Sequence, residues 1–407
     1  MSSIEEIRAE FPQLSDKVYG KPLVYLDNAA TTLRPQNVIS KWSQLSAHCS
    51  ANLHRAVHAV SDKATAEFEA AREETAAFIG AASPREIVFT SGTTHALNML
   101  AFCLGERKNF LHVGDEILIG EAEHHSNILP WQFLAQRKNL KIKVLPVDKR
   151  GALRMEELPR LVTDRTRICC IAQVSNVLGL VNPIRQIADY CHQKGVLLVV
   201  DGAQGIAHCK TDVASLGADF YAFSGHKLYA APGVGVLWGR KALLDILPPY
   251  MGGGEMVGTV KWEASTYAPV PHKFEAGTQN IAGVPTLIPA YTMAYKFRTY
   301  PELEGVKRYM LEALQEIPGL RLFGVPQNFE EKIPLFSFAI EGAHHEDLAL
   351  ILDKMGIAVR SGQMCAEPLM DRFGVTGMVR ASFAPYNTQE EAEFFIKSLK
   401  KAIKMLK

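Results

Sequence analysis

The sequence predicts an α/β protein in which helices cover a mainly parallel central sheet, with a smaller α+β domain at the C-terminal end. Between about residues 60 and 240, short apolar runs alternate with stretches of helical periodicity, as in strands joined by crossover helices. After about residue 283 this alternation ends, and a helical region leads into shorter strands. A chain of 407 residues can form two domains with separate cores.

The elements of the first region can be assigned in order along the chain. Residues 64–79, 94–104 and 183–194 have the apolar spacing of helices. The expected strands are short apolar runs rich in β-branched residues: 86–90, 116–119, 141–146, 167–173, 196–200 and 218–223. Ligands of such sheets bind beyond the carboxyl ends of the strands, so polar residues at those ends are the candidate functional residues.

The C-terminal region begins with a long helical stretch over residues 286–314. Strands are expected at 335–340 and 357–359, and a last helix extends from its N-cap Thr388 to about residue 405. We therefore expect three parts: an N-terminal segment (1–22) that packs on the small domain, a large domain (23–290) and a small C-terminal domain (291–407).

Composition argues against several classes of function. The chain is 47% hydrophobic and 21% charged with a net charge of +1, which gives no reason to expect a nucleic acid or an acidic membrane surface as partner. No stretch approaches the length of a membrane span, and residues 1–10 do not have the pattern of a signal or transit peptide. The 7 cysteines are scattered without a CxxC pair, which favours a cytoplasmic protein over a disulfide framework, and no metal site is expected.

Two strand ends carry the most informative pair of residues. Asp201 directly follows the strand 196–200, and the run 218–223 leads into Ser224, His226 and Lys227. Pyridoxal 5'-phosphate (PLP) requires such a pair, because a lysine amine bonds to its aldehyde and a carboxylate keeps its pyridine nitrogen protonated. Either residue alone is common in α/β proteins, but together they indicate a PLP site.

The segment 91–94 supplies a candidate site for the cofactor phosphate. It joins a strand to a helix and contains Thr93 and Thr94, whose hydroxyls and N–H groups lie where helices bind anions. Ser224 and His226, beside the lysine, can donate to the same phosphate. Threonines at this position also cap helices that bind no ligand. The segment therefore indicates a phosphate site only in combination with Asp201.

Three further polar residues are candidates for contact with the cofactor or substrate. His124 follows a strand, where its ring can stack on the pyridine and carry protons near neutral pH, although a single histidine is more often structural. Asn176 and Gln204 are amides at strand ends. They can contact the phenolic oxygen of the cofactor or the carboxylate of the substrate.

These motifs together resemble the class V aminotransferase family of PLP enzymes, and within it the SUF-type (group II) cysteine desulfurases and selenocysteine lyases. The matching segments follow the family order over nearly the whole chain: YLDNAA (25–30), NLHR (52–55), SGTT (91–94), EHH (123–125), DGAQ (201–204), SGHK (224–227), GGGEM (252–256), FEAGT (274–278), RSG (360–362), CAEP (365–368) and RASF (380–383). The resemblance implies a fold-type I homodimer with active sites at the subunit interface. Thr278 would reach the phosphate bound by the partner subunit, and Glu255 would lie near the dimer contact.

The resemblance also implies roles for individual residues. Lys227 would hold PLP and then act as the base on the Cα proton of L-cysteine, while Asp201 stabilises the protonated ring nitrogen. Arg380 would bind the substrate carboxylate, and Arg360 would add a second contact or a positive field. Cys365, in a loop of the small domain, would attack the substrate sulfur as a thiolate, become a persulfide and release alanine. The expected function is sulfur delivery to an acceptor protein, for iron–sulfur cluster assembly or another use.

One position departs from the family pattern. Group II relatives usually carry histidine before the nucleophile, whereas this chain has Gln363 and Met364 before Cys365. The change removes a proton donor or a thiolate-stabilising group. Three alternatives therefore stay open: a lyase that prefers L-selenocysteine, another class V reaction with Cys365 not essential, and a non-catalytic scaffold, against which the intact cofactor residues argue.

Overall fold

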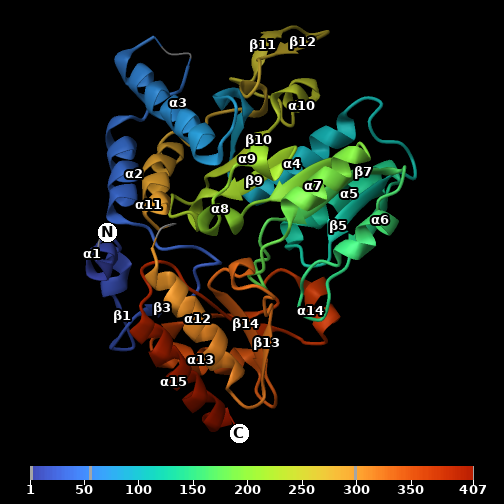
Figure 1. Ribbon diagram of the computed structural model, residues 1–407. Helices are drawn as coiled ribbons and strands as arrows, with labels where there is room; N and C mark the ends of the chain where they lie inside the picture. Colours follow the sequence, from blue (N-terminus) through green and yellow to red (C-terminus); the bar gives the residue numbers. More distant parts are fainter. Residues whose placement is uncertain (1–2, 55–56, 298–299, 407) are drawn as a thin grey trace.

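A seven-stranded sheet organises the larger part of the molecule (Figure 1). The computed structural model describes residues 3–54, 57–297 and 300–406. The strands are β4 (Ile87–Thr90), β5 (Glu116–Gly120), β6 (Lys141–Leu145), β7 (Thr166–Ala172), β8 (Leu197–Asp201), β9 (Phe220–Ser224) and β10 (Gly235–Gly239). Their spatial order is β4-β10-β9-β8-β7-β5-β6, and only β10 runs antiparallel to its neighbours. The prediction of a mainly parallel sheet is therefore confirmed.

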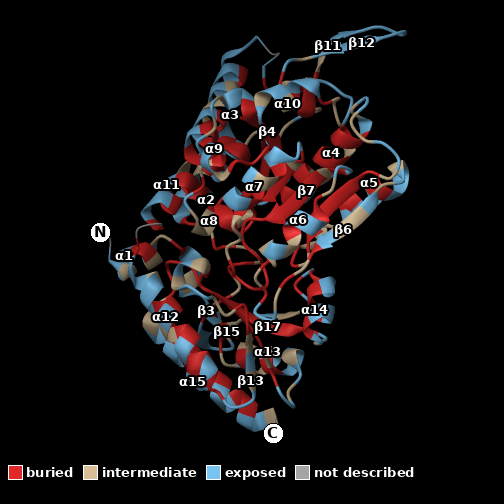
Figure 2. Ribbon diagram, turned by 45° about the vertical axis from the view of Figure 1, so that its right-hand side comes forward, coloured by how far each residue is buried: buried red, intermediate tan, exposed pale blue. Residues whose placement is uncertain are grey.

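Helices cover both faces of this sheet, because alternate side chains of each buried strand point to opposite faces. Leu198 and Val200 of β8 face one core, and Val199 between them faces the other. The first face is covered by α2 (Gln36–His48), α3 (Ala59–Ile79), α7 (Ile184–Gln193) and α11 (Leu287–Phe297). The second is covered by α4 (Thr93–Glu106), α5 (Leu129–Lys138) and α10 (Lys241–Ile246). The inner strands are accordingly buried between two layers of helices, whereas the edge strand β6 is partly exposed (Figure 2).

The C-terminal part is a four-stranded antiparallel sheet with its own core. The spatial order is β13 (Leu320–Phe323), β14 (Leu335–Ile340), β17 (Met378–Ser382) and β16 (Arg360–Gly362). The helices α12 (Glu302–Gln315), α13 (His345–Lys354) and α15 (Gln389–Leu406) pack on this sheet. The backbone N–H of Glu391 donates to Thr388 Oγ1 at 3.1 Å, so Thr388 caps the last helix as expected.

The predicted helical stretch 286–314 is two helices instead of one. α11 ends at Phe297 and α12 begins at Glu302, directly after Pro301. Proline has no N–H and disfavours helical geometry in the residue before it, so it separates the two helices. The spacing of apolar residues did not reveal this break. Because α11 packs in the larger core and α12 in the smaller one, we propose that the domain boundary lies between these two helices.

Two N-terminal segments connect the parts. β3 (Val24–Tyr25) pairs in parallel with β15 (Ile357–Ala358), and Val24 and Leu26 are buried in the smaller core. In contrast, Ile7 of α1 (Ile4–Ala9) packs in the larger core, while Arg8 pairs with Glu391 of α15 at 2.8 Å. The N-terminal segment therefore contacts both cores: Ile7 packs in the larger one and Val24 in the smaller one.

The remaining elements are short. They are β1 (Lys17–Val18), β2 (Lys21–Pro22), α6 (Leu158–Leu161), α8 (Gly205–His208), α9 (Val213–Leu216), β11 (Val257–Val260), β12 (Ser265–Tyr267) and α14 (Glu367–Phe373). The β11–β12 hairpin projects from the large part (Figure 1). Within the described ranges, no helix combines the length and the apolar character needed to cross a membrane.

The smaller core makes a direct prediction about stability. Phe338 of β14 is fully buried, so Phe338→Ala should lower the free energy of unfolding by about 3–5 kcal/mol. The matched substitution Phe394→Ala, at a ring that is 42% exposed on α15, should change it by less than about 0.5 kcal/mol. Urea unfolding followed by circular dichroism measures both, and equal effects would contradict this assignment of the core.

Candidate active site

A cavity of about 570 Å³ opens where the carboxyl ends of β7, β8 and β9 face the C-terminal sheet. Residues from both parts of the molecule line it. Of the residues predicted from the sequence, the cavity brings together twelve: Thr93, Thr94, His124, Asn176, Asp201, Gln204, Ser224, His226, Lys227, Arg360, Cys365 and Arg380. Thr278 lies elsewhere, in a small hollow that His54 and Glu255 also line.

Lys227 and Asp201 are brought together by two adjacent parallel strands. In the register of β8 and β9, Asp201 lies opposite Ala222, and the chain then turns through the short helix Gly225–Lys227. Burial lowers the pKa of the Lys227 ammonium, and Asp201 opposes this shift. Burial raises the pKa of Asp201, while the Ala203 N–H, which donates to Oδ1 at 2.8 Å, and Lys227 lower it. Each charge therefore partly offsets the cost of burying the other.

The predicted anion site is a compact cradle of hydroxyl groups. The Thr93 N–H donates to Ser224 Oγ at 2.8 Å, and the two hydroxyl oxygens are also 2.8 Å apart. A Cβ at Gly235 of β10 would lie 2.3 Å from Gly92 Cα, so only glycine lets β10 approach this loop. The hydroxyls thus lie at the N-terminus of α4, where the helix dipole favours an anion.

Two of the histidines that line the cavity, His124 and His226, have lowered pKa values. Burial, and then the positive charge of Lys227, lower the pKa of His124 to about 4 and that of His226 to about 4. The Nδ1 of His124 accepts from the Ser126 N–H at 3.0 Å, which leaves the ring proton on Nε2. The Nδ1 of His226 is 3.2 Å from Thr31 Oγ1. These rings therefore act as hydrogen-bonding and stacking groups without a charge.

The cysteine loop is held over the cavity by its backbone. Met364 and Cys365 have φ angles of 54° and 55°, in the left-handed region that costs most side chains energy. Asn176 Nδ2 donates to the Met364 carbonyl at 2.9 Å, and the His125 N–H donates to the Cys365 carbonyl at 2.8 Å. These bonds tie the loop to the large part of the molecule, while the Cys365 thiol stays exposed.

Two arginines from the small sheet share one carboxylate that the sequence analysis did not assign a role. Arg360 and Arg380 lie opposite each other on β16 and β17. Asp27 pairs with Arg360 Nη2 at 2.8 Å and with Arg380 Nη2 at 3.3 Å. Arg380 Nη1 also donates to the Asn176 carbonyl at 2.8 Å, whereas its buried Nε has no hydrogen-bond partner among the described residues. The guanidinium is thus fixed in place with one donor unused.

Glu123 is a second residue that sequence reasoning missed. It is buried directly before His124, and it accepts hydrogen bonds from Asn127 Nδ2 at 2.7 Å and from the Ala172 N–H at 2.9 Å. Burial raises its pKa to about 8. The only signal was its place beside His124, since one carboxylate in an apolar segment shows no pattern.

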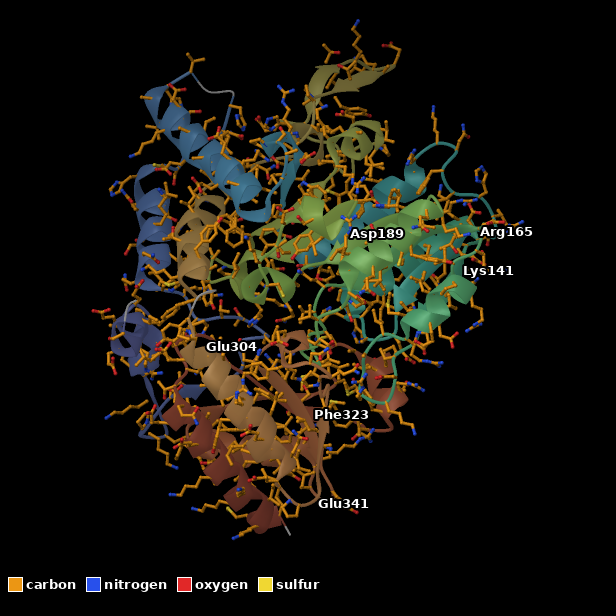
Figure 3. The ribbon with its side chains drawn as sticks, in the orientation of Figure 1. Lys141, Arg165, Asp189, Glu304, Phe323 and Glu341 are labelled. Atoms are coloured by element: carbon orange, nitrogen blue, oxygen red, sulfur yellow. The ribbon has the colours of Figure 1, made fainter. Side chains whose placement is uncertain are left out.

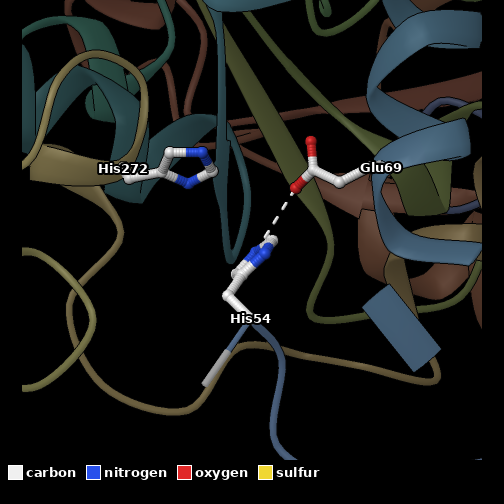
Figure 4. Close-up of side chains that lie close together, drawn as sticks. All are labelled: His54, Glu69 and His272. Atoms are coloured by element: carbon white, nitrogen blue, oxygen red, sulfur yellow. Dashed lines mark ion pairs between the residues drawn. The ribbon is translucent and has the colours of Figure 1, made fainter. Parts of the chain in front are cut away.

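Three side chains outside the cavity have the chemistry of metal ligands (Figure 4). Ligand atoms of His54, Glu69 and His272 lie within 4.8 Å of one another, and His54 Nε2 is 3.4 Å from Glu69 Oε1. However, Arg72 donates to both oxygens of Glu69, at 2.9 and 3.2 Å, and pairs with Glu275 at 2.7 Å. The Arg72 guanidinium already neutralises the carboxylate, so the cluster is explained as the outer part of an ion-pair network around the buried Arg72.

Comparison with known proteins gives one consistent result. The family model described as Aminotransferase class-V matches residues 24–395. The chain is 43% identical over 409 residues to a probable cysteine desulfurase of Vibrio cholerae serotype O1, with 100% of both chains covered. It is 43% identical over 407 residues to a cysteine desulfurase of Serratia proteamaculans, with 99% of each covered.

Solved structures give the same result for the fold. The cysteine desulfurase CsdA of Escherichia coli, in an S-sulfonic acid form, has a TM-score of 0.91 and 38% identity, with 100% of each chain covered. The apo cysteine desulfurase of Thermococcus onnurineus NA1 has a TM-score of 0.93 and 33% identity, covering 100% of this chain and 99% of the other.

The chain therefore belongs to the class-V aminotransferase family of PLP-dependent enzymes. The curated relatives described above, which it matches over its full length, are cysteine desulfurases.

The residues of the cavity fit PLP. The hydroxyl cradle of Thr93 and Ser224 suits its phosphate, and the buried Asp201 carboxylate suits its ring nitrogen. The Arg380 guanidinium, which also lines the cavity, is suited to the carboxylate of an amino acid.

The lowered pKa of Lys227 can be tested directly. In the cofactor-free protein, the Lys227 amine should become neutral, and hence reactive, at a lower pH than an exposed lysine such as Lys400. Competitive labelling with acetic anhydride between about pH 7 and pH 11, read by peptide mass spectrometry, gives both midpoints. If the labelling of Lys227 reached its midpoint at the same pH as that of Lys400, or at a higher pH, burial would not lower the pKa of Lys227.

Proposed function

We propose that the protein is a PLP-dependent cysteine desulfurase that converts L-cysteine to L-alanine and carries the sulfur on Cys365 as a persulfide. One observation carries the proposal: an exposed thiol, Cys365, lines the same cavity as Lys227, Asp201 and Arg380. The full-length similarity to proteins named cysteine desulfurases supports it. A scaffold would need none of these groups.

The cofactor would be held by groups on the large part of the molecule. Thr93, Thr94, Ser224 and His226 would hold the phosphate, and Asp201 the ring nitrogen. Lys227 would bind the cofactor covalently, with His124 against its ring and Asn176 and Gln204 near its phenolic oxygen. When bound, PLP supplies an electron sink that makes the Cα proton of an amino acid acidic.

The substrate carboxylate would bind to Arg380. Asp27 and the Asn176 carbonyl fix the guanidinium in the cavity wall, so the positive charge is already in place when a carboxylate enters. Arg360, held by the other oxygen of Asp27, would add positive charge at the rim. A lysine in place of Arg380 would bind the carboxylate less well, since it lacks the planar fork of donors of a guanidinium.

Lys227 would move the Cα proton. Burial lowers the pKa of its ammonium, so the neutral amine needed in a base is more accessible near neutral pH than in an exposed lysine. His124 would stay neutral during this step, because its pKa is about 4.

Cys365 would then accept the sulfur. Its thiolate would attack the substrate sulfur, so that a new S–S bond forms as the substrate Cβ–S bond breaks, and the released carbon would take a proton to leave as alanine. The loop that positions this thiol is anchored through the backbone oxygens of Met364 and Cys365, which any side chain supplies. The absence of histidine before Cys365 therefore leaves these anchors intact.

The exposed thiol is also placed to pass on its sulfur. We propose an acceptor protein that docks over the cysteine loop, with iron–sulfur cluster assembly as one destination. A soluble partner would reach the persulfide without opening the cavity, because Cys365 already faces the surface.

We further propose a homodimer in which Thr278 completes the site of the partner subunit. Thr278 and Glu255 lie in a hollow that is separate from the main cavity of their own chain. The adjacent β11–β12 hairpin exposes Trp262, Val260 and Tyr267, a set of apolar side chains that a second copy would cover.

Loss of Cys365 provides the decisive test of the reaction. The Cys365→Ala enzyme should keep its PLP absorbance but form alanine from L-cysteine at least about 100-fold more slowly. The matched change Cys209→Ala, at a thiol outside the cavity, should leave the rate unchanged. Alanine release that survives in Cys365→Ala would refute the persulfide step, and activity confined to L-selenocysteine would identify the lyase alternative.

The dimer is tested by a substitution at a distance from the main cavity. Thr278→Val should leave the dimeric mass in light scattering unchanged but weaken PLP binding about tenfold, because one phosphate contact is lost. A monomeric mass for the native protein, or unchanged PLP affinity in the variant, would contradict this arrangement.

A further inference from the structure

His125 lies where the large part of the molecule meets the cysteine loop. It begins the short helix His125–Asn127, directly after His124, and it lines the candidate active-site cavity together with Cys365. Its side chain is partly exposed. The residue therefore belongs to the large part but is placed to contact the loop that carries the thiol.

His125 contacts the cysteine loop at two points. Its backbone N–H donates to the Cys365 carbonyl at 2.8 Å, and its ring Nε2 accepts from the Glu367 N–H at 3.3 Å. An imidazole nitrogen accepts a hydrogen bond only when it carries no proton, so the second contact requires a neutral ring with its proton on Nδ1. One residue thus holds the backbone on both sides of Ala366.

The ring nitrogen takes the place of a helix cap. α14 begins at Glu367, and its N-cap is Ala366, whose methyl group cannot accept a hydrogen bond. The first N–H groups of a helix have no partner within the helix, so an acceptor from elsewhere stabilises this end. His125 supplies that acceptor for the Glu367 N–H, which is closer to Nε2 than the Glu367 carboxylate at 4.0 Å.

The other end of α14 is fixed to the small sheet. The ring centroids of Phe373 and of Phe323 on β13, which Figure 3 labels, are 5.0 Å apart. The Phe373 carbonyl also accepts from Arg321 Nη1 at 2.9 Å. The small sheet thus holds the C-terminal end of α14, while His125 ties its N-terminal end, next to the thiol, to the large part.

The conformation of the cysteine loop requires such support. Met364 and Cys365 both have φ angles in the left-handed region, and residues keep that conformation only where surrounding contacts hold it. On the N-terminal side of the thiol, Asn176 donates to the Met364 carbonyl, and the Met364 side chain is buried in the larger core. On its C-terminal side, the corresponding contacts come from His125.

We propose that His125 is a positioning residue that holds the Cys365 thiol at the cavity through the hydrogen bond from the Glu367 N–H to its ring. The inference rests on the proposed function, since it concerns the step in which Cys365 accepts the sulfur. Without the ring acceptor, the loop would sample other positions, and the attack on the substrate sulfur would slow because it needs a fixed geometry. Steps that involve only the cofactor, Lys227 and Arg380 would continue.

Substitutions at His125 separate the ring from the backbone, since every variant keeps the N–H that donates to Cys365. His125→Gln places its amide oxygen near the position of Nε2 and should keep the contact with the Glu367 N–H. His125→Leu has no acceptor. His125→Asn is too short to reach this N–H, and it is polar, so it also serves if the leucine variant does not fold. His112→Leu, at an exposed histidine outside the cavity, is the matched control.

The first measurement is alanine formation from L-cysteine by the PLP-loaded enzyme. In His125→Leu and His125→Asn, kcat should fall at least about fivefold while KM stays within about twofold of the parent value. In His125→Gln and His112→Leu, kcat should stay within about twofold. Exchange of the Cα proton of L-alanine in D2O needs the cofactor and Lys227 but no thiol, so all four variants should keep the parent rate. If this exchange fell together with kcat, His125 would act at the cofactor, and the proposal would be wrong.

The second measurement does not depend on activity. Amide hydrogen exchange in a peptide that contains Glu367, read by mass spectrometry, should be at least about threefold faster in His125→Leu and His125→Asn than in the parent and in His125→Gln. Equal exchange in all of them, or a loss of kcat in His125→Gln as large as in His125→Leu, would overturn the proposal. A parent enzyme that forms no alanine would contradict the proposed function instead, and the amide exchange alone would then decide whether the ring holds the loop.

Discussion

The burial of opposite charges at the ends of β8 and β9 is the constraint on which the candidate site depends. Asp201 and Lys227 each pay a desolvation cost that shifts their pKa toward the neutral form, and each partly relieves the other. The parallel register of the two strands brings them together, and it does so at the sheet edge where the hydroxyl cradle of Thr93 and Ser224 also lies. The pair thus places one positive and one negative group in the same cavity.

A few polar contacts join this edge to the small sheet. Asp27 holds Arg380, Arg380 holds the Asn176 carbonyl, and Asn176 holds the Met364 carbonyl of the cysteine loop. Next along the same segment, the Val177 carbonyl accepts from Ser337 and the Leu178 carbonyl from Lys332. One short segment of the large part therefore contacts both the candidate active site and the C-terminal part of the chain.

Most of the candidate site was predictable because its residues lie at strand ends, and strands are recognised from local apolar patterns. The same approach missed β10, in which two of five residues are glycine, and missed the break between α11 and α12 at Pro301. It also missed the role of Asp27. Nothing near Asp27 in the chain shows its partners, since Arg380 is 353 residues away.

By itself, the sequence determined that the strands form a mainly parallel sheet, because strands and crossover helices follow from local periodicity. It also determined the chemical groups at the carboxyl ends of the strands, because these follow from residue type. Only the tertiary structure decided which charges meet. Asp27 lies between two arginines of another sheet, whereas Lys332 is buried against carbonyls without a carboxylate. Such pairings depend on how two separate cores pack against each other, and no short stretch of sequence carries that information.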